Sequence, residues 1–110
     1  MKETRPWGFY EILSESDNHK SKYIYVEANN RLSYQKHQNR SEHWFIVSGV
    51  ASVTINGNLR LMHPGDSIDI KAGDLHRVAS TSDPVEFIEV QTGTYFGEDD
   101  IERIEDDYGR

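Results

Sequence analysis

Short runs in which apolar and polar residues alternate fill most of this chain of 110 residues, and turn-forming residues separate the runs. Alternation puts every second side chain on one face of a strand, and turns at intervals of about eight to twelve residues are typical of β-sandwiches and β-barrels. The pattern predicts strands over residues 8–13, 23–28, 31–37, 43–48, 51–55, 59–62, 67–70, 76–80 and 85–91. No stretch before residue 95 has helical periodicity. We therefore expect an all-β fold.

The clearest local signal lies in residues 53–61, where Asn56 and Gly57 stand between two alternating runs. A two-residue type I′ turn requires a positive φ at both central residues, which the pair Asn-Gly adopts readily. We therefore expect a tight hairpin at this point. No low-complexity linker or internal repeat divides the chain. Residues 1–110 are thus predicted to form a single domain, because this length suits one hydrophobic core.

Composition excludes several classes of protein. The chain contains no cysteine, so disulfides, thiolate metal sites and cysteine nucleophiles are absent. No apolar run approaches the roughly 18 residues of a membrane helix, and the first residues do not resemble a signal peptide. We therefore expect a cytoplasmic protein without a membrane partner.

The net charge of −7 is concentrated at one end of the chain. Residues 98–110 contain seven acidic residues and two arginines, so they carry −5 of this charge. Such an acidic segment predicts a short helix or an ordered tail. The overall acidity argues against a nucleic-acid partner, whereas the nearly neutral remainder is compatible with a small anionic ligand.

Three of the five histidines follow a pattern that predicts a shared site. Gln35 and His37 have the same parity on one predicted strand, so their side chains leave the same face if the strand is regular. A turn or bulge before the next strand leaves open whether Glu42 or His43 points inward, and continued parity favours His43. Further along, a tight Gly-Asp turn places His76 at the start of another strand.

Imidazoles that converge from neighbouring strands, with a carboxamide beside them, are typical ligands of a divalent metal such as Zn, Fe, Mn or Ni. The predicted metal ligands are therefore His37, His43, His76 and Gln35. Their spacing does not choose among these metals. The other two histidines lie in polar surroundings and are expected to be solvated.

Several stretches carry a family resemblance. Residues 33–51 and 65–80 resemble the two cupin motifs. The segments Arg5-Pro6-Trp7-Gly8, Arg40-Ser41-Glu42-His43-Trp44 and Ile88-Glu89-Val90-Gln91-Thr92-Gly93, together with residues 97–110, resemble the type II phosphomannose isomerases. The resemblance covers nearly the whole chain.

This resemblance implies a cupin barrel, that is, a double-stranded β-helix or jelly roll, that holds a divalent metal. It also implies an enzyme that interconverts mannose 6-phosphate and fructose 6-phosphate, and a homodimer. In that family the domain often follows a mannose-1-phosphate guanylyltransferase. The present residues contain no Gly-rich phosphate loop ahead of the predicted barrel, so we expect no nucleotidyl transfer from them.

Isomerisation between an aldose and a ketose requires a base and, for a sugar phosphate, an anchor for the phosphate. Glu89 and Gln91 alternate on the last long strand, so both can face the interior. Glu89 is the predicted base, with Glu42 as the competing candidate, and Gln91 is predicted to bind substrate. Arg40 and Arg77 stand beside predicted ligands and are expected at the barrel mouth, because guanidinium groups bind phosphate well.

Three hypotheses follow for the function. The first is a metal-dependent sugar-phosphate isomerase. The second is a non-catalytic cupin module that binds a sugar or a metal. The third is another cupin enzyme, such as a sugar epimerase or an iron dioxygenase. Gln38 and Asn39 stand where cupins usually have a further histidine, which favours the second hypothesis. Glu89 and Gln91 favour the first.

Overall fold

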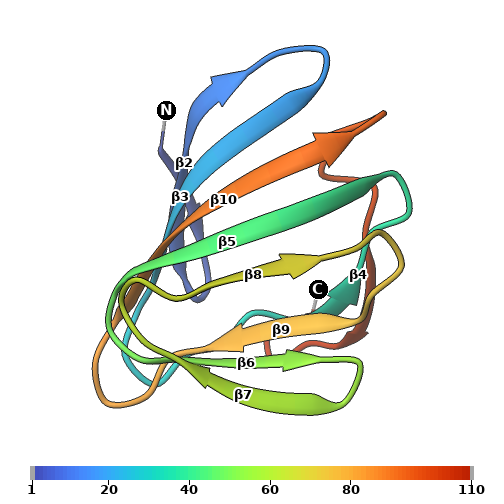
Figure 1. Ribbon diagram of the computed structural model, residues 1–110. Coiled ribbons are helices and arrows are strands. Elements are labelled where there is room, and N and C mark those ends of the chain that lie inside the picture. Colours follow the sequence, from blue (N-terminus) through green and yellow to red (C-terminus); the bar gives the residue numbers. More distant parts are fainter. Residues whose placement is uncertain (1, 110) are drawn as a thin grey trace.

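The computed structural model describes residues 2–109, so Met1 and Arg110, the two ends of the predicted domain, lie outside the described residues. Two antiparallel sheets face each other and enclose the core (Figure 1). The strands are β1 (Lys2–Arg5), β2 (Gly8–Glu15), β3 (His19–Val26), β4 (Tyr34–Lys36), β5 (Arg40–Ser48), β6 (Ala51–Ile55), β7 (Asn58–Met62), β8 (Ser67–Ile70), β9 (His76–Ala79), β10 (Val85–Gly93) and β11 (Glu102–Glu105). One sheet has the order β1-β2-β3-β10-β5-β8, and the other the order β11-β4-β9-β6-β7.

The predicted all-β fold is confirmed, and each of the predicted strands is present. The ends of β6 and β8 are those predicted, and at least one end of each other predicted strand is shifted. Two further strands, β1 and β11, were not predicted. β1 reads Lys-Glu-Thr-Arg and β11 is exposed along its whole length, so neither has an apolar alternation to reveal it. Within residues 2–109 the acidic ending forms no helix. It is an ordered tail whose strand pairs with β4.

The predicted hairpin is confirmed between β6 and β7, where Ile55 pairs with Asn58. Both residues of the turn have a positive φ, 48° at Asn56 and 84° at Gly57. These are the signs that a type I′ turn requires.

The inward-facing positions divide the barrel into an apolar end and a polar end. At the apolar end, Ile24, Ile46 and Phe87 are buried on three neighbouring strands. Nearer the other end, the buried positions of the same strands carry polar and charged side chains, namely Lys20, Lys22, Arg40, Glu42, Glu89 and Gln91. Burial of so many charges is costly unless they pair with one another or with a ligand. The polar end is therefore where a functional site is expected.

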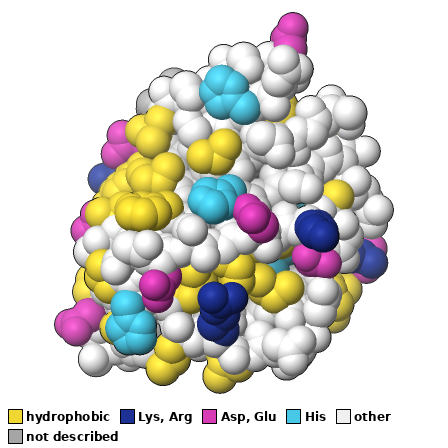
Figure 2. Space-filling model, viewed as in Figure 1, with side chains coloured by type: hydrophobic (Ala, Val, Ile, Leu, Met, Phe, Trp, Pro, Cys, Tyr) yellow, Lys and Arg dark blue, Asp and Glu magenta, His cyan; other side chains and the backbone are white. Residues whose placement is uncertain are grey.

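The outer face of the six-stranded sheet is partly apolar. Figure 2 shows hydrophobic side chains gathered over this sheet, and Phe45 and Val47 of β5 are 45% and 43% exposed. The homodimer predicted from the cupin resemblance stays a prediction. Within residues 2–109, no helix is long and apolar enough to cross a membrane.

Candidate active site

A pocket opens at the polar end of the barrel, between the two sheets. Its walls come from β3, β5 and β10 of one sheet and from β4 and β9 of the other. The segment before β2 and the segment after β10 complete its rim, through Arg5, Trp7, Glu98 and Ile101. Residues that lie at the two ends of the sequence thus border one site.

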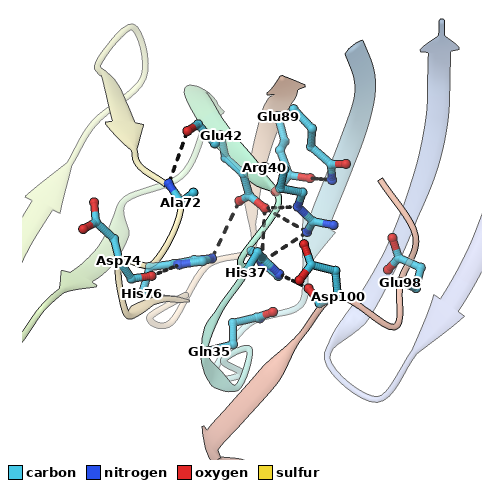
Figure 3. A network of polar contacts seen from close by, with 12 residues as sticks. Gln35, His37, Arg40, Glu42, Ala72, Asp74, His76, Glu89, Glu98 and Asp100 are labelled. Carbon is cyan, nitrogen blue, oxygen red and sulfur yellow. Dashed lines mark hydrogen bonds and ion pairs between the residues drawn. The ribbon is translucent and has the colours of Figure 1, made fainter. Parts of the chain in front are cut away.

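His37, Glu42 and His76 form a buried cluster in this pocket (Figure 3). One ligand atom from each residue lies within 4.8 Å of the others. Nε2 of His37 is 3.2 Å from Oε2 of Glu42, and Nε2 of His76 is 3.7 Å from Oε1 of the same carboxylate. The three residues are no more than 4% exposed. His37, Glu42 and His76 come from different strands or connections, so the fold itself assembles the cluster.

Hydrogen bonds to the backbone orient both imidazole rings. Nδ1 of His37 is 2.7 Å from the carbonyl oxygen of Asp100, and Nδ1 of His76 is 2.9 Å from that of Asp74. Because a carbonyl oxygen only accepts, each Nδ1 donates, and the Nε2 of a neutral ring then carries a lone pair. Burial lowers the pKa of His37 to about 4, so this ring is neutral near pH 7. The lone pair of His37 therefore points toward the carboxylate of Glu42, and Nε2 of His76 faces the same carboxylate.

This donor set fits a divalent metal. Two imidazoles and one carboxylate are a recurrent set of metal ligands, and outer hydrogen bonds that fix the imidazoles are usual at such sites. No hydrogen bond joins Nε2 of His76 to Glu42, although the two groups face each other. A metal ligand must be an unprotonated imidazole, and an unprotonated Nε2 facing a carboxylate repels it unless a cation lies between them. His37, Glu42 and His76 would therefore hold the metal.

Arg40 supplies positive charge to one side of the cluster. Its Nη2 is 2.8 Å from Oε2 of Glu42 and 3.2 Å from Nε2 of His37, to which it donates. Arg40 is only 7% exposed. The prediction that Arg40 lies at the mouth is therefore wrong, because the parity of β5 directs its side chain inward with Glu42.

The structure also corrects the choice between Glu42 and His43. Glu42 points into the pocket, whereas His43 lies on the outer face of β5, where its Nδ1 is 2.6 Å from Asp69. The expectation that His43 faces inward is wrong because β4 and β5 belong to different sheets. The connection between them does not preserve the alternation of side chains, so parity cannot be carried from His37 to His43.

Glu89 lies beside the cluster, as predicted, and is buried. Trp44 Nε1 donates to Oε1 of Glu42 at 3.0 Å and to Oε1 of Glu89 at 3.1 Å, so the indole joins the two carboxyl groups. Gln91 Nε2 donates to the other oxygen of Glu89 at 2.7 Å. These contacts fix the orientation of Glu89.

The two carboxyl groups differ in their tendency to ionise. Burial and the negative charge of Glu42 raise the pKa of Glu89 to about 7. Burial also opposes ionisation of Glu42, but His76 and Arg40 outweigh it, so the pKa of Glu42 is lowered. Environments that separate the pKa values of two neighbouring acids commonly give them different roles. Here Glu42 is suited to be an ionised ligand and Glu89 to be an acid or base.

The remaining predicted residues lie at the pocket but with other partners. Arg77 is nearly buried, and its guanidinium donates to the carbonyl of Leu32 at 2.9 Å and to Glu105 at 3.0 Å. It therefore attaches the β11 segment to the barrel and does not project from the rim. Gln35 lines the pocket, and its amide is 3.4 Å from the carbonyl of Ser33. Its role as a ligand stays a prediction.

Sequence reasoning missed Lys20 and Lys22, which are buried on the inner face of β3. Their parity was available, because Ile24 and Val26 on the same strand are core residues. Sequence reasoning also missed Asp100, whose carboxylate accepts the backbone N–H groups of residues 38 and 39 at 3.0 and 2.9 Å. No local pattern could link Asp100 to that turn.

Two facing sheets around a pocket with a His-Glu-His cluster define a small barrel of the cupin class. Solved structures with this fold include KdgF from Halomonas sp., with a TM-score of 0.80 and 14% identity, covering 88% of this chain and 86% of that one. They also include oxalate decarboxylase from Bacillus subtilis, with a TM-score of 0.82 and 18% identity, covering 94% of this chain and 30% of that one. At such identities the likeness shows the fold alone.

The chain belongs to the family described as mannose-6-phosphate isomerase C-terminal, whose sequence profile matches residues 1–106. The alginate biosynthesis protein AlgA of Pseudomonas aeruginosa is 46% identical over 107 residues. The mannose-1-phosphate guanylyltransferase ManC of Salmonella typhimurium is 42% identical over 107 residues. Each match covers 96% of this chain and 22% of the relative, so the chain spans about a fifth of the length of these proteins. The predicted family is thereby confirmed.

Proposed function

We propose that this chain is a metal-dependent isomerase that interconverts mannose 6-phosphate and fructose 6-phosphate. The observation that carries the proposal is the position of Glu89, a buried carboxyl group with a pKa near 7, directly beside a His-Glu-His cluster. A general base works best when its pKa is near the operating pH. Membership of the mannose-6-phosphate isomerase C-terminal family supports this substrate pair.

The reaction moves one proton from C2 to C1 of the sugar and one from O2 to O1. When bound by His37, Glu42 and His76, a divalent metal supplies a Lewis acid for the carbonyl oxygen. Glu89 in its ionised form takes the proton from C2 and returns it to C1. Trp44 and Gln91 hold this carboxylate in place during both transfers. Burial of Glu89 restricts access of water, so the proton is returned to the sugar.

Glu42 is less suited to be the base. One of its oxygens accepts from Arg40 and the other from Trp44, and both face imidazole nitrogens. A carboxylate that is engaged in this way is a ligand or an ion-pair partner, whereas Glu89 makes no ion pair within 4.0 Å among residues 2–109. We therefore assign the ligand role to Glu42 and the base role to Glu89.

The charge of the pocket favours an anionic substrate. Its lining includes five cationic side chains, Arg5, Lys22, Arg40, Arg77 and Arg103. It includes three acidic ones, Glu42, Glu89 and Glu98. An excess of positive charge in a chain of net charge −7 concentrates anions at this site. This excess favours a sugar phosphate over a neutral sugar.

An assay of the purified protein tests the proposal. We expect conversion of mannose 6-phosphate to fructose 6-phosphate in the presence of at least one of Zn²⁺, Fe²⁺, Mn²⁺ or Ni²⁺. A chelator should abolish turnover and the same metal should restore it, while unphosphorylated mannose should react far more slowly. A folded protein that binds metal but is inactive with every metal would contradict the isomerase and support a non-catalytic binding module.

A further inference from the structure

We propose that Lys22 binds the phosphate of the sugar phosphate, and that Glu98 occupies the phosphate position in the substrate-free protein. The inference rests on the proposed function and names the anion subsite within it. Nζ of Lys22 is 2.9 Å from Oε2 of Glu98, and Nζ of Lys20 is 4.0 Å from the same oxygen. One carboxylate oxygen thus lies near two ammonium groups. The two lysines are 4% and 7% exposed.

The two lysines lie on a strand, whereas Glu98, the carboxylate that they face, lies on a connecting segment. Lys20 and Lys22 are built into the inner face of β3, a long strand at the centre of its sheet. Glu98 lies between β10 and β11, outside any strand, and its side chain is 48% exposed. Figure 3 shows Glu98 on this connecting segment, away from the His-Glu-His cluster. A half-exposed carboxylate can be displaced into water, whereas the buried lysines cannot follow it.

A phosphate group satisfies this pair of lysines better than one carboxylate does. It carries more negative charge near pH 7 and presents three oxygens that accept strong charge-assisted hydrogen bonds. The ring of Tyr10 lies 4.1 Å from Nζ of Lys22, and Glu98 is the anion that this ammonium group contacts. The chemical class of ligand that we infer is therefore a phosphomonoester.

The register of the sheet places this subsite correctly for the proposed reaction. Glu89 of β10 is the direct cross-strand neighbour of Lys22 on one side and of Trp44 on the other. The base therefore lies between the lysine and the His-Glu-His cluster. β3 and β5 are separated by two strand spacings, about 10 Å. A ligand with its anionic group and its reacting carbons at opposite ends of a short chain fits this order.

The arginines that were predicted to bind phosphate have other partners. Arg40 donates to Glu42 and His37 within the cluster, and Arg77 donates to Glu105 and a backbone carbonyl. Displacing these partners would break buried ion pairs or detach β11. Releasing Glu98 requires neither, so of Lys22, Arg40 and Arg77 it is Lys22 that an incoming phosphate can reach at the lowest cost.

Titration with inorganic phosphate, followed by calorimetry on the purified protein, tests this subsite without requiring turnover. We expect Lys22→Gln to weaken phosphate binding by about tenfold or more, because it removes the principal charge. We expect Glu98→Gln to strengthen binding several-fold, because it removes the competing carboxylate. Lys36→Gln is the matched control, since Lys36 is a lysine that pairs with Glu102 at the surface, and it should leave binding unchanged.

Unchanged phosphate binding in Lys22→Gln, or weaker binding in Glu98→Gln, would overturn the assignment. Glu98→Gln removes only a half-exposed charge, so it remains decisive if Lys22→Gln does not fold. With mannose 6-phosphate, Lys22→Gln should raise KM far more than it lowers kcat. Phosphate binding at Lys22 without any isomerisation would contradict the proposed function alone. Isomerisation with an unchanged KM in Lys22→Gln would contradict the phosphate subsite alone.

Discussion

Replacing His76 with alanine is expected to abolish divalent metal binding and to lower isomerase turnover more than about 100-fold. Replacing a residue that only hydrogen-bonds to a metal ligand commonly costs up to about 100-fold, and loss of a ligand itself should cost more. Nε2 of His76 points at Glu42, and its Nδ1 is held by the carbonyl of Asp74. The substitution removes one of the two imidazole lone pairs of the site. Metal content of the purified variant, measured together with turnover, checks the prediction.

His43→Ala is the matched control for this experiment. His43 also has one polar partner at Nδ1, but it lies on the outer face of β5, and its side chain is 48% exposed. The variant should keep the metal content and turnover of the unmodified protein. Retention of metal in His76→Ala would contradict the role of His76 as a ligand. Loss of metal in His43→Ala would contradict the assignment of Glu42 as the inward ligand in place of His43. Circular dichroism would show that both variants are folded.

Replacing Glu89 with glutamine is expected to reduce turnover by about 10² to 10⁴, the usual contribution of a general acid or base. An amide has almost the shape of a carboxylic acid but cannot accept the proton from C2. The metal should remain bound, because Glu89 is outside the ligand set. Measuring kcat and metal content in the same preparation separates this effect from that of His76→Ala.

The surroundings of Glu89 favour a folded Glu89→Gln variant. Its pKa of about 7 means that the folded protein already accommodates an uncharged side chain at this position. Oε1 of Gln91 has no hydrogen-bond partner within the described residues 2–109, so a flip of the Gln91 amide lets it accept from the new amide. A variant with nearly full turnover would exclude Glu89 as the base.

The pH dependence of the same variant gives a second readout. Only the ionised carboxylate can accept a proton, so turnover of the unmodified protein should rise as the pH increases through the pKa of Glu89. The residual activity of Glu89→Gln should lack this rise. If turnover of both proteins rises with pH in the same way, the rise would belong to the titration of another group.

The sequence predicted most of the fold because alternation and turn residues act locally. Asn56 and Gly57 determined their hairpin through their own conformational preferences. β11 was not predictable in this way, because its residues are all exposed and its pairing with β4 joins distant parts of the chain.

The site was predicted less completely for a related reason. On β5 both faces carry apolar residues, since Trp44 is buried and Phe45 is exposed next to it. Hydrophobicity alone therefore did not reveal which of Glu42 and His43 points inward. The contact between Lys22 and Glu98 joins residues 76 positions apart, which no strand pattern can indicate.

The most direct test of the metal centre is anomalous X-ray diffraction from crystals of the purified protein, collected at the absorption edge of the metal found in it. We predict one strong anomalous peak among Nε2 of His37, Nε2 of His76 and the carboxylate of Glu42. The absence of a peak there in a protein that is active with metal, or a peak at His43, would contradict the proposed centre.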